Sequence, residues 1–325
     1  MKSIWFSFVV LGVLVGSAHA QAPLTLEAKI PLGEVKGRID HLAIDLGRHR
    51  LFVAELGNDS VGVVDLDQRK VIHVIAGLKA PQGIAHEAST DTLYVANGGD
   101  GTVRMFRAAD LVSLGRIDLG DDADNIRLDA AAKRLFVGYG SGALAVLDPG
   151  NRNKIAEIAL KAHPESFQLD TGTSRIFVNV PDKQTISVVD RNAGREIAAW
   201  PTGNRTHFAM ALDHESKRLL VSFRDPPKLG VFDMGSGSLI GSVATCGDVD
   251  DMFVDAKRRR LYVSCGEGFV DVFDNASGAY ARLARITTLP RARTSLFVPE
   301  IDRFFVAARA ATEQPAAVWV FRPTP

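Results

Sequence analysis

Apolar positions along this chain recur in short runs rather than in helical stripes. Seven runs share one form: a basic residue or threonine, an apolar residue, an aromatic residue or leucine, and then valine. The runs end at Val53, Val95, Val137, Val178, Val221, Val263 and Val306. The spacings between these valines are 42, 42, 41, 43, 42 and 43 residues. A period of roughly 20 to 50 residues is typical of solenoids, propellers and other repeat architectures.

Each repeat contains four short β-type runs separated by turn residues. In the first repeat these runs are His41 to Asp45, Arg50 to Ala54, Ser60 to Asp65 and Lys70 to Ile75. No segment shows a sustained period of 3.6 residues, so few helices are expected. Four strands in a repeat of this length correspond to one propeller blade. We therefore predict an all-β fold, a seven-bladed β-propeller with four antiparallel strands per blade.

The two ends of the repeat array predict how the ring closes. The last repeat ends with a third strand at Val318 to Phe321 and has no fourth strand after it. Leu24 to Leu32 is a strand-like run that precedes the first inner strand and belongs to no repeat. We expect this run to be the outer strand of the last blade, because closure removes exposed strand edges. Residues 21–325 are then a single propeller domain.

The first twenty residues have the pattern of a signal peptide. Lys2 precedes an apolar run from Ile4 to Gly16, and Ala18-His19-Ala20 has the small-x-small form of a cleavage site. The alternative, an uncleaved anchor, is disfavoured because no stop-transfer pattern follows. We expect a periplasmic or secreted protein that begins at Gln21 and is not inserted in a membrane after cleavage.

Charge excludes one broad class of partner. The chain has 38 Lys and Arg against 38 Asp and Glu, a formal net charge of zero, and it has no acidic or basic tail. The basic footprint of a duplex nucleic-acid binder is therefore missing, and the neutral balance also argues weakly against single-stranded nucleic acid. The expected partner is a small molecule, a peptide or a protein, and the chain is expected to be a monomer.

The repeat motif resembles that of a known family. The relevant segments are Tyr94-Val95-Ala96-Asn97, Phe52-Val53-Ala54, Phe177-Val178-Asn179 and Tyr262-Val263-Ser264. They resemble the Tyr-Val-Thr-Asn signature of the YVTN β-propeller repeat family, and the similarity covers nearly all of residues 24–322. The resemblance implies the fold. It implies no single activity, because such propellers include binding proteins, surface proteins and distant relatives of seven-bladed lactonases.

The two cysteines fall in the sixth repeat. Cys246 lies before its inner strand and Cys265 just after its second strand, so the two are near partners across one hairpin. In an oxidising compartment this placement favours a disulfide over free thiols. The C-x-x-C spacing of a redox-active pair is not present.

Polar residues gather where the inner strands begin and where the second strands end. In a propeller these positions meet at one mouth of the central channel, where ligands of this fold usually bind. The candidate ligand-binding residues are Asp40, His41, Glu55, Gln82, Asn97, Asn125, Tyr139, Glu165, Asn179, His207, Arg224, Asp251, Glu267 and Arg293. In the wider rim, Arg205, Arg224, Arg291, Arg293 and Arg309 are expected to face Asp40, Asp124, Glu165 and the aspartates of the sixth repeat.

Three interpretations of this rim remain open. It can be an ordinary solvated rim, because strand ends and loops are polar in most proteins. It can be a pocket of opposed charges whose arginines recognise carboxylate or phosphate. It can also hold a divalent metal through His41, His163 and His207, because imidazole and carboxylate suit zinc and similar ions. The remaining histidines, His49, His73, His86 and His214, are expected on outer strands or far turns.

Catalytic motifs give little support for an enzyme. The sequence has no G-x-S-x-G elbow, no H-E-x-x-H pair and no D-x-D-x-D-G loop. No catalytic residue is assigned, and no cofactor is predicted apart from the metal alternative. The first hypothesis is an exported binding or protein-interaction module that uses the polar channel mouth. The alternative is a lactonase-like, metal-assisted hydrolase or lyase at the same mouth.

Overall fold

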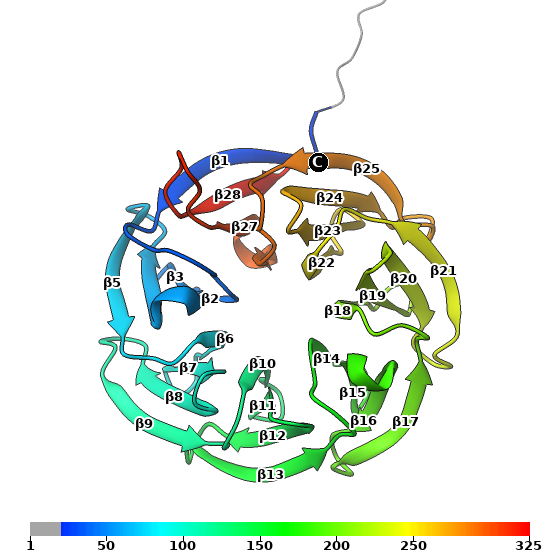
Figure 1. Cartoon of the computed structure of the whole chain (residues 1–325), viewed down its shortest axis with the longest axis horizontal. Helices are drawn as coiled ribbons and strands as arrows, with labels where there is room; N and C mark the ends of the chain where they lie inside the picture. The colour runs from blue at the N-terminus through cyan, green and yellow to red at the C-terminus, as the bar shows by residue number, and fades with distance from the viewer. Residues whose placement is uncertain (1–20) are drawn as a thin grey trace, which may run out of the picture.

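The protein is a ring of seven four-stranded antiparallel sheets, as the predicted fold class requires (Figure 1). The structure is a computed structural model, and it describes residues 21–325. The predicted signal peptide, residues 1–20, lies outside the described residues. Within residues 21–325, no helix has the length and apolar character needed to cross a membrane.

The first four blades follow one another along the chain. Blade one comprises β2 (Leu42–Asp45), β3 (Arg50–Glu55), β4 (Ser60–Asp65) and β5 (Lys70–Ala76). Blade two comprises β6 (Pro81–Glu87), β7 (Thr92–Asn97), β8 (Thr102–Arg107) and β9 (Ser113–Asp118). Blade three comprises β10 (Ala123–Asp129), β11 (Arg134–Tyr139), β12 (Ala143–Asp148) and β13 (Asn153–Ala159). Blade four comprises β14 (Phe167–Leu169), β15 (Arg175–Val180), β16 (Thr185–Asp190) and β17 (Arg195–Pro201).

The last three blades complete the ring. Blade five comprises β18 (His207–Asp213), β19 (Arg218–Arg224), β20 (Pro227–Asp233) and β21 (Leu239–Ala244). Blade six comprises β22 (Val249–Asp255), β23 (Arg260–Cys265), β24 (Phe269–Asp274) and β25 (Ala281–Thr287). Blade seven comprises β26 (Ser295–Val298), β27 (Arg303–Ala308), β28 (Ala317–Pro323) and β1 (Leu24–Pro31). Three single 3-10 turns, η1 (Leu56–Asn58), η2 (Pro181–Lys183) and η3 (Pro299–Ile301), interrupt the strand pattern.

Ring closure is confirmed by the pairing of β1 with β28, which lie side by side in Figure 1. Leu24 pairs with Pro323 and Ile30 with Val318. Arg260 of the neighbouring blade donates a hydrogen bond to the carbonyl of Thr324 at 2.5 Å. The first strand and the end of the chain are therefore joined both within blade seven and to blade six.

The core lies between adjacent blades. The aromatic position of the repeat motif is buried there: Phe52 packs with Leu93 of the next blade, and the Tyr262 ring lies 5.2 Å from that of Phe304. Full burial of such a side chain contributes about 1.5–3 kcal/mol. The motif repeats because every blade must fill the same space against its neighbour.

An acidic residue ends the inner strand, or directly follows it, in six of the seven blades. These residues are Asp45, Glu87, Asp129, Asp170, Asp213 and Asp255. Each accepts a hydrogen bond from the backbone of the following turn, as Asp45 does from Arg48 at 3.1 Å and Asp255 from Arg258 at 3.2 Å. Aspartate is favoured in turns for this reason. The acidic repeat at this rim is therefore structural.

The predicted disulfide is present. Cys246 and Cys265 are bonded, with their Cα atoms 5.8 Å apart. Cys265 pairs with Val249 in the ladder, and Cys246 precedes Val249 by three residues. The bond therefore ties the segment that leads into β22 to the end of β23.

Candidate functional site

The inner strands place two rings of seven side chains around the channel. The first ring, where these strands begin, comprises His41, Gly83, Asn125, Ser166, Ala209, Asp251 and Thr294. The second ring, two residues further along each strand, comprises Ala43, Ala85, Arg127, Gln168, Ala211, Phe253 and Leu296. All seven members of the second ring line a channel cavity of about 500 Å³, and His41, Ser166 and Asp251 of the first ring border it. We call the first ring the neck of the channel.

His41 is the imidazole at the neck. Its Nδ1 lies 3.5 Å from Oδ2 of Asp251, and its Nε2 lies 3.7 Å from Oδ1 of Asp40. Burial by itself lowers the pKa of His41, but the charges of Asp251, Asp40 and Asp124 outweigh burial and raise the pKa to about 10. His41 is therefore a cation at neutral pH, surrounded by carboxylates.

Three carboxyls lie near this cation at the mouth, Asp40 buried and Asp124 and Glu165 half-buried. The Asp40 side chain is only 1% exposed, and burial raises its pKa despite the nearby charges of His41 and Arg38. Burial also raises the pKa of Asp124, to about 7, with the charge of Asp40 adding to the effect. For Glu165, burial raises the pKa and the charge of His163 opposes that rise. The positive charges of the protein therefore only partly stabilise the ionised forms of these acids.

A close approach of two strands positions Asp124. Gly83 of β6 faces the start of β10, and a Cβ atom at Gly83 would lie 2.1 Å from the carbonyl oxygen of Asp124. Only a residue without a side chain allows this contact. The glycine therefore lets blade three bring Asp124 into the acidic group at the neck.

On the other side of the mouth, arginines form ion pairs with aspartates. Arg293 contacts Asp248 at 2.6 Å and Asp250 at 2.8 Å, and Arg224 also contacts both aspartates. The Arg224 guanidinium lies 3.8 Å from the centre of the Phe208 ring. Burial raises the pKa of Asp250, but Arg293 and Arg224 outweigh it and hold this pKa below its usual value. This half of the mouth is internally neutralised.

Between the two halves lies a hollow of about 30 Å³, which we call the mouth hollow. It is lined by Arg38, His41, Asp124, Asn125, Glu165, Ser166, Phe208 and Asp250. Asn125 is 4% exposed, and its Oδ1 has no hydrogen-bond partner among the described residues. Buried amide oxygens are normally paired. A polar group seated in the hollow would supply the missing partner.

Several predicted site residues instead form bonds within or between blades. Glu55 accepts a hydrogen bond from Ser60 at 2.6 Å, and Asn97 donates to the carbonyl of Val95 at 3.1 Å. The Tyr139 hydroxyl contacts Lys154 at 2.8 Å on the outer strand.

Three further candidates also have partners within the protein. Asn179 donates to the carbonyl of Phe208 at 2.7 Å. Gln82 contacts Asp122 at 3.2 Å, and Glu267 accepts from the backbone of Gly247 at 2.8 Å. Of the fourteen candidates, the mouth hollow itself gathers only His41, Asn125 and Glu165.

The three histidines considered for a metal are not brought together. Nδ1 of His207 lies 2.9 Å from the carbonyl oxygen of Asn204, and its Nε2 lies 2.9 Å from that of Thr185. Nδ1 of His163 lies 2.6 Å from the carbonyl oxygen of Gly140. Burial lowers the pKa of His207, and the two backbone carbonyls oppose that lowering. Both nitrogens of His207 thus face backbone carbonyls rather than the other two histidines.

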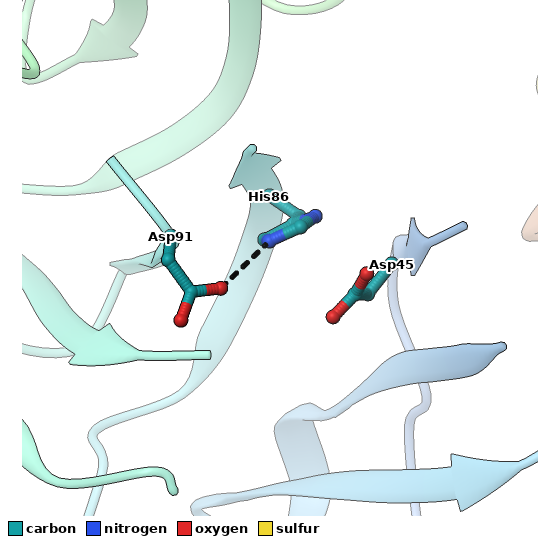
Figure 2. Close-up of side chains that lie close together, drawn as sticks. All are labelled: Asp45, His86 and Asp91. Atoms are coloured by element: carbon teal, nitrogen blue, oxygen red, sulfur yellow. Dashed lines mark ion pairs between the residues drawn. The ribbon is translucent and has the colours of Figure 1, made fainter. Parts of the chain in front are cut away.

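A different group of residues has metal-like spacing, at the other end of the channel. Asp45, His86 and Asp91 place their ligand atoms within 4.8 Å of one another. Figure 2 shows the His86 ring between the two carboxylates. Arg48 also contacts Asp45 and Asp91, each at 2.7 Å, so a guanidinium already supplies the positive charge. We therefore interpret this group as an interblade ion pair.

The prediction that His86 lies on an outer strand or far turn is wrong. It belongs to inner strand β6 and lines the channel cavity, and the turn residue His214 lines the cavity as well. The inner strand of blade two extends to Glu87, so His86 still lies within it and precedes the turn. His49 lies in a turn and His73 in outer strand β5, as predicted.

Two arginines at the neck were missed among the candidates. Arg38 lies on the connection from β1 to β2 and contacts Asp40 at 2.7 Å. No repeat position predicts it, because this connection occurs once in the chain. Arg127 was detectable, because it is the one Lys or Arg within the seven inner strands of the described structure.

The fold and this site define a seven-bladed propeller with a charged neck. No family model matches the chain, and no curated protein matches it. The resemblance to YVTN propellers therefore depends on the repeat residues alone.

Solved structures match over nearly the whole chain. One is a chain of the "Crystal Structure of Mitotic Checkpoint Complex", with TM-score 0.77 and 14% identity, covering 98% of both chains. Another is "Kuenenia stuttgartiensis Hydrazine Synthase", with TM-score 0.69 and 16% identity, covering 95% of this chain and 98% of that one. At these identities the likeness shows the seven-bladed fold alone.

Proposed function

We propose that this protein is an exported binding module of the YVTN type, and that its mouth hollow holds a positively charged group of a small molecule or peptide. The observation that carries the proposal is the group of three acids at the mouth, Asp40, Asp124 and Glu165, whose pKa values are raised by desolvation. A ligand cation would compensate their charge, and the unpaired amide oxygen of Asn125 would accept one of its hydrogen bonds.

Export is part of the same proposal. The leader pattern over residues 1–20 supports it, and the bond between Cys246 and Cys265 is typical of oxidising compartments. A periplasmic or secreted location fits both. The mass of the protein recovered from producing cells, compared with that of a chain starting at Gln21, tests this part.

Calorimetry with small amines tests the binding site. We expect agmatine to bind more tightly than the dianion glutarate, and its binding to release protons at pH 6 because the cation lowers the raised pKa values. The Glu165→Gln variant should weaken agmatine binding at least tenfold, about 1.4 kcal/mol. Glu300→Gln, at an exposed residue in the far turn η3, is the matched control. Equal binding by both variants would contradict the proposal.

A metal-assisted hydrolase or lyase at the same mouth is the second candidate. The observation that favours it is the pKa of about 7 for Asp124, which suits a general acid or base at neutral pH. Turnover of simple lactones that is abolished in Asp124→Asn would support this candidate. Agmatine binding without turnover, unaffected by a chelator, would support the binding module instead.

A further inference from the structure

The channel cavity below the neck has a different character from the mouth hollow. It encloses about 500 Å³, the range of small-molecule sites. Ile44, Leu169, Leu212, Phe253 and Leu296 contribute apolar walls. Just below the neck, Arg127 and the His41–Asp251 pair border the cavity. Toward the far end, His86 and His214 border it, so the apolar side chains form a belt between two polar ends.

Arg127 is unusual among its equivalents in the second ring. The other six positions hold alanine, glutamine, phenylalanine or leucine. Each of these residues faces the aromatic or leucine position of its own second strand, as Arg127 does with Phe136. The Arg127 guanidinium lies 5.6 Å from the centre of the Phe167 ring of the next blade. Stacking on a neighbouring blade holds the guanidinium in place.

The guanidinium has little polar compensation. Its one hydrogen bond goes from Nη1 to the carbonyl of Ile126 at 2.9 Å, and no carboxylate of residues 21–325 lies within 4.0 Å of it. Burial lowers the pKa of Arg127. Arg127 is half-buried, and a guanidinium stays charged in such a position. Arg127 is therefore a cation without a close counterion.

The nearest acids are engaged elsewhere. Asp251 accepts a hydrogen bond from the backbone of Ser295 at 2.8 Å and lies 3.5 Å from His41. Asp124 acts on the pKa of Arg127 through its charge, but it forms no ion pair with Arg127 within 4.0 Å among the described residues. Neither acid is a dedicated partner of Arg127. An anion that enters the cavity can take that place.

We propose that the channel cavity is a second binding site, for a small amphipathic carboxylate whose head pairs with Arg127 and whose apolar body lies along the channel wall. The Ser166 hydroxyl, which also lines the cavity, is placed to donate to the same head. The walls exclude water from the apolar body, and arginine offers a carboxylate two parallel hydrogen bonds. This site goes beyond the proposed function, because it lies across the neck from the mouth hollow and recognises the opposite charge.

Octanoate, with octanamide and octylamine as comparison probes, tests the site in the full chain by calorimetry. Octanoate should bind at least tenfold more tightly than octanamide, which has the same apolar body but no charge. Arg127→Met should remove that preference, and Arg127→Lys should retain part of it. Arg116→Met, at an exposed arginine of outer strand β9, should leave octanoate binding unchanged.

A second variant separates a binding defect from a folding defect. Ala211→Leu narrows the cavity at the second ring while leaving Arg127 in place, so it should weaken octanoate and octanamide together and leave agmatine binding intact. Far-UV circular dichroism establishes that each variant is folded. Equal affinities for octanoate and octanamide in the wild type, or an unchanged octanoate affinity in folded Arg127→Met, would overturn the site. Loss of agmatine binding alone would count against the mouth proposal and not against this one.

Discussion

The two ends of the channel contain the same kinds of residues, but Asp45 at the far end has an arginine partner and Asp124 at the mouth has none among the described residues. At the far end, Arg48 contacts Asp45 and Asp91 at 2.7 Å each and joins blade one to blade two. Arg258 joins blade six to blade seven in the same way, through Asp255 and Asp302. At the mouth, no guanidinium of the described residues lies within 4.0 Å of Asp124.

The pKa shifts of Asp45 and Asp124 have opposite directions for this reason. Burial raises the pKa of Asp45, but hydrogen bonds from Arg48 and the charge of His86 outweigh burial, and the pKa falls below its ordinary value of 3.8. Burial raises the pKa of Asp124 to about 7, and no such bond opposes it. Two acidic clusters of similar composition therefore differ in whether an arginine pairs with each of their carboxylates. A paired cluster stabilises the fold, and an incompletely paired one is a candidate ligand site.

The largest expected loss of stability comes from removing one partner of an ion pair at the far end of the channel. The Arg258 side chain is 9% exposed, and its partner Asp255 is 2% exposed. Arg258→Ala leaves a buried carboxylate without its counterion, which costs about 3–5 kcal/mol of unfolding free energy. Urea denaturation followed by fluorescence measures the loss. Agmatine binding to the protein that remains folded should be unchanged, because Arg258 is far from the neck.

The control for this variant is an exposed pair of the same chemistry. Arg107 and Asp110 contact each other at 2.7 Å with side chains 48% and 47% exposed. Arg107→Ala should change stability by about 0–1 kcal/mol. If Arg258→Ala were no more damaging than Arg107→Ala, the far-end clusters would not be structural.

An intermediate effect on stability is expected from replacing one acid at each end of the channel. The two replacements should depend on pH in opposite ways. The folded-state pKa of Asp124 is about 7 against an ordinary value of 3.8, so the folded state binds more protons between these values. Stability is therefore lost as pH rises from about 4 to about 7. Asp124→Asn should stabilise the protein by about 1–3 kcal/mol at pH 8 and have little effect at pH 4, because one pKa unit is about 1.4 kcal/mol.

Asp45 should behave in the opposite way. Its pKa is lowered in the folded state, so its contribution is present above pH 3.8 and is lost as pH falls below that value. Asp45→Asn should therefore destabilise the protein by about 1–3 kcal/mol at neutral pH. Unfolding free energies measured from about pH 2 to pH 8 compare the two variants. Parallel pH profiles would remove the distinction between the two ends.

The smallest effect is expected at a candidate residue that lies outside the mouth hollow. The Tyr139 hydroxyl bonds to Lys154 and Glu157 on outer strand β13. Tyr139→Phe removes a partly exposed hydrogen bond and should cost about 0.5–1.5 kcal/mol. It should leave agmatine and octanoate affinities unchanged in calorimetry. A tenfold loss of either affinity would mean that Tyr139 reaches a ligand after all.

The sequence predicted the ring well and the site only in part. The valine spacing placed every blade, and the run from Leu24 to Leu32 predicted closure, because each blade must bury the same face against its neighbour. His41, Asn125 and Glu165 were correctly expected at the start of inner strands. Repeat register does not say which way a side chain turns, and Tyr139 and His207 turn away from the channel to bond within and between blades.

The sequence by itself determined what repeats, which is seven blades with four strands in each, and also the hairpin placement of Cys246 and Cys265. These follow from local periodicity and from turn chemistry. Tertiary structure alone decided which charges meet. Arg38 reaches Asp40 from a connection outside the repeat, and Gly83 admits Asp124 from the next blade. Whether a carboxylate finds a counterion across the ring depends on contacts between blades, and these determine which acids stabilise the fold and which remain available to a ligand.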